Sequence, residues 1–417
     1  MKNTPIFDYP NYLNKIFDKL KNNGIKSIIV GGYVRDFFLN IDSKDIDIEL
    51  LGVNSYQELS NILKEFGRVN NVGKSFGVCK LSLENLEIDF TLPRTDNKIA
   101  SGHSGFLVKT DKNLDFKTAS SRRDFTMNSI GYDVDKEIFI DPFDGIQDIK
   151  YKLIKAVNLE KFDEDPLRVF RAVSFRSRLE FNLDEKLFVL CKNMCEKDLL
   201  FELAKERVYD EIKKIFLKSP RPSSAFVLLK KLGGLKYLQP LDALDAKDFL
   251  SIMNAIDRMK QLSKKDNDTN FFLMLSVICY KFTKNDLGIF LSRLTNKTKL
   301  SKNIASLTKT KFEFSYTDSE ILHLATKVNI ELFLLFSQAL HPSVDAEIFL
   351  SLKKRAINLG ILNSKQEALL KGRDIINLGI KPSKDYADIL DKAYTLQIDL
   401  ILKTREDALL WLKQYLL

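Results

Sequence analysis

One short run of alternating acidic and apolar residues constrains the fold of this chain most. Residues 45–50 read DIDIEL, so that the isoleucines and leucine take one face of an extended strand and the carboxylates the other. Asp45 and Asp47 would then lie side by side, about 6 to 7 Å apart at the backbone. Like charges so placed repel unless a cation lies between them, and Mg²⁺ favours one or two carboxylates plus substrate phosphates. We therefore predict that Asp45 and Asp47 are catalytic residues that hold Mg²⁺.

A glycine pair precedes this run. Gly31 and Gly32 follow the apolar segment 28–30 and open a predicted helix from Val34. Such a turn presents backbone N–H groups and a helix N-terminus to phosphate. A phosphate site beside a metal site favours phosphoryl or nucleotidyl transfer.

A third carboxylate supports this interpretation. The segment 86–90 reads LEIDF and repeats the alternation. If this strand neighbours the first, Asp89 joins the same acidic face, and we predict it as a third catalytic residue. The alternative is that both segments are ordinary strands whose acidic faces are solvated.

The composition fits a multi-domain protein that binds a polyanion. A chain of 417 residues predicts two to four domains, and its net charge of +9 favours nucleic acid as a partner. Residues 281–311 hold eight Lys or Arg and one acidic residue, with Phe282, Phe290 and Phe312 interleaved. This segment is either a phosphate-binding surface or a set of solvated helix faces.

Other features exclude several classes of protein. Cys79, Cys191, Cys195 and Cys279 form no disulfide framework, and no histidine nearby completes a zinc site. Buried free thiols are expected. The N-terminus lacks a signal-peptide core, and the longest apolar run, 271–280, is about half of a membrane span. We expect a cytoplasmic protein without a membrane segment.

The pattern of periodicity changes near residue 150, from mixed α/β to helical. A helix is predicted over 55–66, with Ser55 as its N-cap, and a mobile loop over 94–113. The predicted strands are 28–30, 46–50, 78–83, 87–90, 129–132 and 138–140.

A second cluster of polar residues, 122–128, reads RRDFTMN. Two arginines suit the oxygens of a triphosphate through forked hydrogen bonds. Asp124 or Asn128 could accept a hydrogen bond from a ribose 2′-hydroxyl. The alternative is a local surface pairing of Arg with Asp that contributes little.

A third cluster follows Pro166, which suits the first turn of a helix. Asp165, Arg168 and Arg171 recur along one side of that helix. Cytosine and adenine both present an amine donor beside a ring-nitrogen acceptor, and a carboxylate next to a guanidinium complements that pattern. The pair could therefore accept C and A and reject U and G. A capping Asp with solvated arginines is the alternative.

Taken in order, these motifs resemble the class II tRNA nucleotidyltransferases, the CCA-adding enzymes, which are relatives of bacterial poly(A) polymerases. The resemblance rests on the runs 31–36, 45–47, 122–128, 141–145 and 164–168, and extends to 205–211, 372–379, 396–397 and 404–406.

The resemblance implies an α+β fold. A polymerase-β-like nucleotidyltransferase head with a mixed sheet would span 1–149, followed by a helical neck (150–235), body (236–370) and tail (371–417). The neck would read the base, and the body and tail would bind tRNA.

The resemblance also implies template-independent addition of C, C and A to tRNA 3′ ends from CTP and ATP, with pyrophosphate release. Asp45 and Asp47 would hold the Mg²⁺ ions. The nucleotide would be bound by Gly32, Arg35, Arg123, Asp124, Asp165, Arg168 and Arg171. No membrane or DNA partner is expected. The chain departs from the family pattern at Ser174, where relatives often carry arginine.

Several alternatives stay open from the sequence. A partial enzyme would add only CC, only the last A, or a poly(A) tail. A non-catalytic RNA-binding protein would have lost acidic positions that this chain retains. Transfer to a protein or an antibiotic would not require a long basic helical half.

Overall fold

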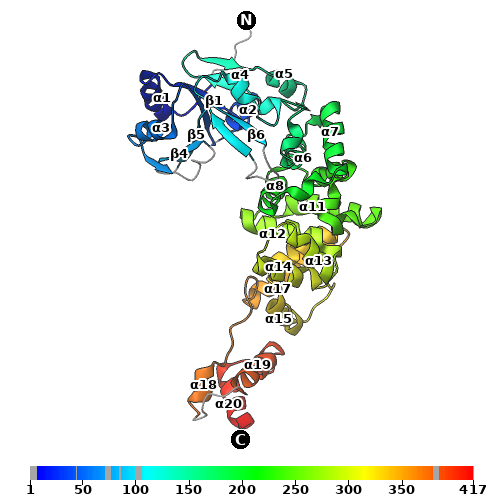
Figure 1. Cartoon of the computed structure of the whole chain (residues 1–417). Coiled ribbons are helices and arrows are strands. Elements are labelled where there is room, and N and C mark those ends of the chain that lie inside the picture. The colour runs from blue at the N-terminus through cyan, green and yellow to red at the C-terminus, as the bar shows by residue number, and fades with distance from the viewer. Residues whose placement is uncertain are drawn as a thin grey trace. The chain divides into compact units, whose positions relative to one another are not determined.

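A computed structural model describes residues 7–43, 45–70, 77–83, 86–98, 106–378 and 385–416 (Figure 1). The chain divides into two compact units. The first unit comprises 1–215 and 224–237, and the second comprises 216–223 and 238–417. The finer division into neck, body and tail stays a prediction.

The first unit is built on a seven-stranded mixed sheet with the strand order β3-β4-β5-β2-β1-β8-β9. Only the β2–β5 pair is parallel, and the other neighbouring strands of this sheet are antiparallel. The strands are β1 (Lys26–Val30), β2 (Asp47–Leu51), β3 (Arg68–Asn70), β4 (Val78–Leu83), β5 (Leu86–Thr91), β8 (Gly131–Asp133) and β9 (Ile138–Ile140). The predicted α+β fold with a mixed sheet is confirmed.

Each strand predicted from the sequence overlaps a strand of this sheet. The segment 94–113 differs from its prediction. We expected a loop, but β6 (Arg94–Lys98) pairs with β7 (Phe106–Thr110) in a two-stranded antiparallel ribbon. Polar residues dominate β6, so that no apolar alternation marked it as a strand. The connection 99–105 lies outside the described residues.

Short helices accompany the sheet. They are α1 (Tyr12–Asn22), α2 (Gly32–Phe38), α3 (Tyr56–Leu63), α4 (Phe116–Ser120) and α5 (Gly145–Lys150). The predicted cap is confirmed, because the Ser55 side chain accepts a hydrogen bond from the backbone N–H of Glu58. The apolar residues of α3, Leu59, Ile62 and Leu63, are buried as its periodicity predicted.

The rest of the described chain is helical apart from one short parallel pair, β10 (Leu153–Ile154) with β11 (Asn182–Leu183). The helices are α6 (Leu167–Leu179), α7 (Glu185–Glu196), α8 (Lys205–Lys218), α9 (Ser223–Lys231), α10 (Gln239–Asp242), α11 (Ala246–Leu262), α12 (Asn267–Ile278), α13 (Lys284–Ser292), α14 (Thr298–Lys309), α15 (Asp318–Lys327), α16 (Ile330–Leu340), α17 (Ala346–Asn358), α18 (Gly372–Ile376), α19 (Asp385–Ile398) and α20 (Arg405–Leu416). Residues 370–412 contribute a small core of their own, centred on Ile375 and Leu412.

All four cysteines are free and buried, as expected. In the part of the chain that the structure describes, no helix combines the length and the apolar character that crossing a bilayer requires. The aromatic residues of 281–311 are less available than the sequence suggested. Phe290 is fully buried in the core, and the half-buried Phe282 packs on it, so that neither ring is freely exposed.

Candidate active site

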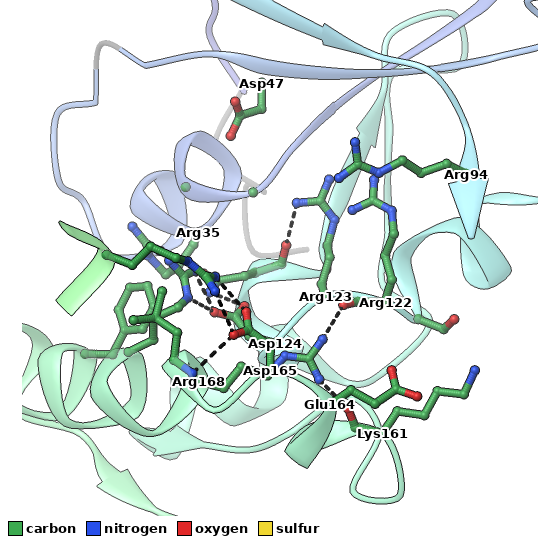
Figure 2. A pocket seen from close by; sticks show the side chains of 18 of the residues that line it. Arg35, Asp47, Arg94, Arg122, Arg123, Asp124, Lys161, Glu164, Asp165 and Arg168 are labelled. Atoms are coloured by element: carbon green, nitrogen blue, oxygen red, sulfur yellow. Dashed lines mark hydrogen bonds and ion pairs between the residues drawn. The ribbon is translucent and has the colours of Figure 1, made fainter. Parts of the chain in front are cut away.

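A cavity of about 560 Å³ lies in the first unit, where the sheet meets α6 and α8 (Figure 2). Most of the charged side chains that line it are cationic. The lining residues are Gly31, Gly32, Arg35, Asp47, Arg94, Thr118, Ser121, Arg122, Arg123, Asp124, Asn128, Lys161, Glu164, Asp165, Leu167, Arg168, Arg171, Phe175 and Arg207. Eight Lys or Arg against four Asp or Glu give the cavity a positive potential that suits a polyphosphate.

Strand pairing brings two of the predicted carboxylates, Asp47 and Asp89, together. Asp47 is the first residue of β2 and pairs in register with Asp89 on β5. Asp45 precedes β2 and is exposed. Of these three residues only Asp47 lines the cavity. Burial raises the pKa of Asp47, and the nearby charges of Asp89 and Asp45 raise it further, whereas Arg123 and Lys80 lower it.

A fourth carboxylate of the same run has a different environment. Glu49 is fully buried and accepts hydrogen bonds from Arg122 (3.1 Å) and Arg123 (2.8 Å). Burial on its own would raise the pKa of Glu49, but the two guanidinium groups outweigh it and the pKa is lowered. Glu49 therefore fixes the two arginines of the 122–128 segment against the sheet, a role that the sequence analysis missed.

The glycine turn lies against these groups. Gly31 has φ of +74°, and a Cβ at this position would lie 3.1 Å from Oδ2 of Asp47 and 3.4 Å from Nη1 of Arg123. Glycine is needed there both for the backbone conformation and for the space. Gly32 begins α2, which carries Arg35. Arg35 donates to Asp36 (2.6 and 2.9 Å) and to the buried side chain of Asn128 (2.7 Å).

Asp124 is the centre of a buried network rather than a surface pair. It accepts hydrogen bonds from Asn128 (3.0 Å), Arg171 (2.6 Å) and the backbone N–H of Phe125 (2.8 Å). Burial alone would raise the pKa of Asp124, but Arg171 and Asn128 outweigh it and the pKa is lowered. The network joins the segment after β7 to α6, and Arg171 also lies 3.7 Å from Glu211 on α8.

Asp165 and Arg168 both line the cavity, but they have different partners. Arg207 on α8 donates to both carboxylate oxygens of Asp165, at 3.1 and 2.9 Å. Arg168 donates instead to the backbone carbonyls of Lys161 (2.7 Å) and Arg122 (2.9 Å), as Figure 2 shows. Arg207 stood in a motif of the sequence but had no predicted role. Its contact joins residues 42 positions apart, which no local pattern reveals.

Ser174 occupies the position where the family resemblance leads us to expect an arginine. Its side chain is buried in α6, and within the described residues its hydroxyl has no hydrogen-bond partner. Phe175 follows it and lies under three guanidinium groups, those of Arg35, Arg171 and Arg178, at 5.0 to 5.5 Å. Such cation–π contacts hold cationic side chains near a ring. Phe175 was not predicted, because a buried aromatic residue on a helix carries no functional signal.

The acidic edge has the chemistry of a Mg²⁺ site that is completed by substrate. Carboxylate oxygens are the ligands that Mg²⁺ takes, and it commonly uses one or two of them together with phosphate oxygens and water. Burial and acidic neighbours raise the pKa of Asp47 despite Arg123 and Lys80, and a further cation would offset that repulsion. No group of three or more His, Cys, Asp or Glu able to hold a metal occurs among the described residues. Asp47, with Asp89 and Asp45 near it, offers carboxylate oxygens, and substrate phosphates would supply further oxygen ligands.

Comparisons with known proteins agree with this arrangement. Residues 27–155 match the family model "Poly A polymerase head domain", and residues 180–243 match "Probable RNA and SrmB- binding site of polymerase A". The CCA-adding enzyme of Blochmanniella floridana is 30% identical over 344 residues, which cover 76% of this chain and 79% of that protein. Other curated relatives, named multifunctional CCA proteins, align over 49 to 51% of their own length.

Solved structures show the same fold at lower sequence identity. The Bacillus stearothermophilus CCA-adding enzyme in complex with CTP superposes with a TM-score of 0.76 and 20% identity, covering 98% of each chain. The Thermotoga maritima CCA-adding enzyme complexed with tRNA superposes with a TM-score of 0.65 and 21% identity, covering 98% of this chain and 97% of that one. The extended sequence match to the Blochmanniella floridana enzyme shows that this chain belongs to the family of CCA-adding enzymes, the tRNA nucleotidyltransferases.

Proposed function

We propose that this chain adds C, C and A to the 3′ ends of tRNA from CTP and ATP, without a nucleic-acid template. One observation carries the proposal. A single cationic cavity is lined by Asp47, by the Arg122–Arg123 segment and by Asp165 with Arg168. These groups supply what an incoming nucleotide needs, namely a metal ligand, cations for three phosphates and a donor–acceptor pair for the base. Two structures described above support the choice of substrates, since one contains CTP and the other tRNA.

The triphosphate would lie along Gly32, Arg35 and Arg123. A guanidinium has five N–H donors. Arg35 uses three of these donors in hydrogen bonds to Asp36 and Asn128. Arg123 donates one hydrogen bond to Glu49 and another, at 3.5 Å, to the backbone carbonyl of Asn128. The remaining donors are held in fixed directions by these bonds, which prearranges them for phosphate oxygens.

The sugar and base would be bound by the opposite wall of the cavity. Asp124 would line the ribose side of the nucleotide, and Arg171 is fixed beside it by their 2.6 Å contact. Asp165 would accept from the exocyclic amine of cytosine or adenine, and Arg168 would donate to the ring nitrogen. Uracil and guanine present the reverse pattern, which leaves buried polar groups unpaired.

Nucleotidyl transfer then follows from position and charge. Asp45 and Asp47 would hold Mg²⁺, with Asp89 adjacent. When bound, Mg²⁺ would lower the pKa of the tRNA 3′-hydroxyl and stabilise negative charge on the triphosphate. The 3′-oxygen forms the new bond to the α-phosphorus, the bond to the β-phosphate oxygen breaks, and pyrophosphate leaves. The arginines of the cavity orient the α-phosphate for this in-line displacement.

A terminal-addition assay tests the proposal. tRNAs that lack the last three, two or one nucleotides are each incubated with labelled CTP or ATP and Mg²⁺. Addition of CMP to the first two substrates and of AMP to the third is expected. Incorporation of CMP alone, of AMP alone or of a long run of AMP would identify a CC-adding enzyme, an A-adding enzyme or a poly(A) polymerase instead. Binding of tRNA without any incorporation would indicate a non-catalytic RNA-binding protein.

A further inference from the structure

The contact between Arg207 and Asp165 assigns a role to a residue outside the predicted nucleotide-binding set. Arg207 lies on α8, and Asp165 lies just before α6. Both side chains are largely shielded, with 23% and 20% of their surface exposed, and the two guanidinium N–H groups reach both carboxylate oxygens. A forked contact of this kind fixes the plane of a carboxylate as well as its position.

The hydrogen bonds of Asp165 leave one acceptor position for a ligand. A carboxylate oxygen carries two lone pairs. Oδ1 accepts from Arg207 (3.1 Å) and from the backbone N–H of Leu167 (3.2 Å), which uses both of its positions. Oδ2 accepts from Arg207 alone (2.9 Å) among the described donors. A base that offers one amine donor can bind at this remaining position on Oδ2. A base that offers a carbonyl oxygen there cannot, because two acceptors would then face each other.

We propose that Arg207 is a positioning residue that sets nucleotide selectivity, because it holds Asp165 in the orientation that accepts a single donor from the base. This inference rests on the proposed function. Arg168 does not share this role, because its Nη1 and Nη2 donate to the carbonyls of Lys161 and Arg122 rather than to Asp165. Without Arg207 only the backbone N–H of Leu167 still holds the carboxylate, so that its plane is no longer fixed and both oxygens regain an open position. Discrimination between C and U then falls.

The experiment compares kcat/KM for CTP and for UTP on tRNA that lacks its terminal nucleotides. The variants are Arg207→Ala, Arg207→Lys and the control Arg176→Ala, which removes a guanidinium from α6 outside the cavity lining. We expect the CTP-to-UTP ratio to fall by about tenfold or more in Arg207→Ala. The ratio of Arg207→Lys should lie between those of the wild type and Arg207→Ala, because an ammonium group keeps the charge but lacks the two parallel N–H groups of a guanidinium. Arg176→Ala should keep the wild-type ratio.

A purely structural role predicts a different result. Loss of folded enzyme lowers kcat/KM for CTP and for UTP by the same factor and leaves their ratio unchanged, because selectivity is a property of the molecules that remain active. An unchanged ratio in Arg207→Ala would therefore overturn the inference. In the Asp165→Ala background, substitution of Arg207 should no longer alter the ratio, since the two residues act as one unit. An additive effect would also contradict the proposal.

A failure of the proposed function can be distinguished from a failure of the proposed role of Arg207. If the wild-type chain incorporates no CMP, nucleotidyl transfer to tRNA is wrong. Equilibrium binding of CTP and UTP to the wild type and to Arg207→Ala then still decides the role of Arg207, because the same ratio is measured without turnover.

Discussion

Asp47 and Asp89 are paired in register on β2 and β5, the one parallel pair of the seven-stranded sheet. Side chains of paired residues on neighbouring strands leave the same face of a sheet. The two carboxylates therefore lie together although they are far apart in the sequence. Lys80 lies 3.2 Å from Asp89, but Asp47 faces the cavity and its pKa is raised by burial and by its acidic neighbours.

The first prediction concerns this pair. Asp47→Asn removes a charged ligand from the proposed metal site, and CMP and AMP incorporation should fall by about a hundredfold or more. Binding of tRNA in a gel-shift assay should be unchanged. Glu87→Gln serves as the control, because Glu87 is an exposed carboxylate on the same strand as Asp89. Full turnover by Asp47→Asn with Mg²⁺ would exclude Asp47 as a ligand.

Two glycines with nearly the same positive φ give the second prediction. Gly31 and Gly24 have φ of +74° and +73°, but a Cβ on Gly24 meets open space whereas one on Gly31 meets Asp47 and Arg123. Substitution by alanine should strain the backbone by about 1 to 3 kcal/mol at each position. Only Gly31→Ala should also raise KM for CTP. Thermal unfolding and initial rates measure the two effects. Equal activity losses in both variants would show that strain alone is responsible.

The sequence predicted those parts of the molecule that depend on local pattern. Alternation located the strands of the sheet, and the Ser55 cap located the start of α3. The burial of Glu49 could not be predicted, because its partners Arg122 and Arg123 lie 73 and 74 positions away. An acidic residue in an alternating strand is normally solvated, and only tertiary contact with two cations makes its burial favourable.

Contacts between distant segments also could not be predicted for the residues proposed to read the base. Helical spacing placed Asp165, Arg168 and Arg171 along one side of α6, and all three line the cavity. Spacing within one helix could not show that α8 supplies the partner of Asp165, nor that Arg168 is held by backbone carbonyls. Their roles toward the base stay predictions that the selectivity measurements above test.

The third prediction concerns the buried pair of Asp124 and Arg171, which are 2.6 Å apart. Asp124→Asn leaves the Arg171 charge without its main partner and should lower the free energy of unfolding by about 3 kcal/mol at neutral pH. Asp210→Asn, on the exposed face of α8, should have little effect. The measurement is urea denaturation of the full chain. Equal stability of Asp124→Asn and the wild type would contradict a stabilising role for the pair.

The difference in the free energy of unfolding between the wild type and Asp124→Asn should depend on pH, and the pKa of Asp124 determines how. Burial would raise this pKa, but Arg171 and Asn128 together hold it below the ordinary value of 3.8. A lowered carboxyl pKa contributes stability that is fully present above the unfolded value and is lost as the pH falls through the folded one. The stability difference between the wild type and Asp124→Asn should therefore be constant near neutrality and narrow as the pH falls below 3.8. A difference that widens on acidification would show that the pKa is raised instead.

The last prediction tests the basic helical segment as a surface for tRNA. Lys299, Lys302 and Lys309 are exposed on α14, which has no acidic residue in its first turn. Each lysine that contacts a phosphate on a duplex region contributes about 0.9 to the slope of log K against log salt, because binding releases condensed counterions. Changing the three lysines to glutamine should weaken tRNA binding and flatten that slope by about 0.9 for each phosphate that is no longer neutralised.

The control changes the same charge elsewhere. Lys15, Lys64 and Lys136 are exposed on the first unit, and their change to glutamine should leave the salt slope as it was. Incorporation of CMP at saturating tRNA should be unaffected in the α14 variant, because these lysines lie outside the cavity lining. If the slope is unchanged in the α14 variant, the lysines of α14 are a solvated helix face. The tRNA must then be held by other cations of the chain.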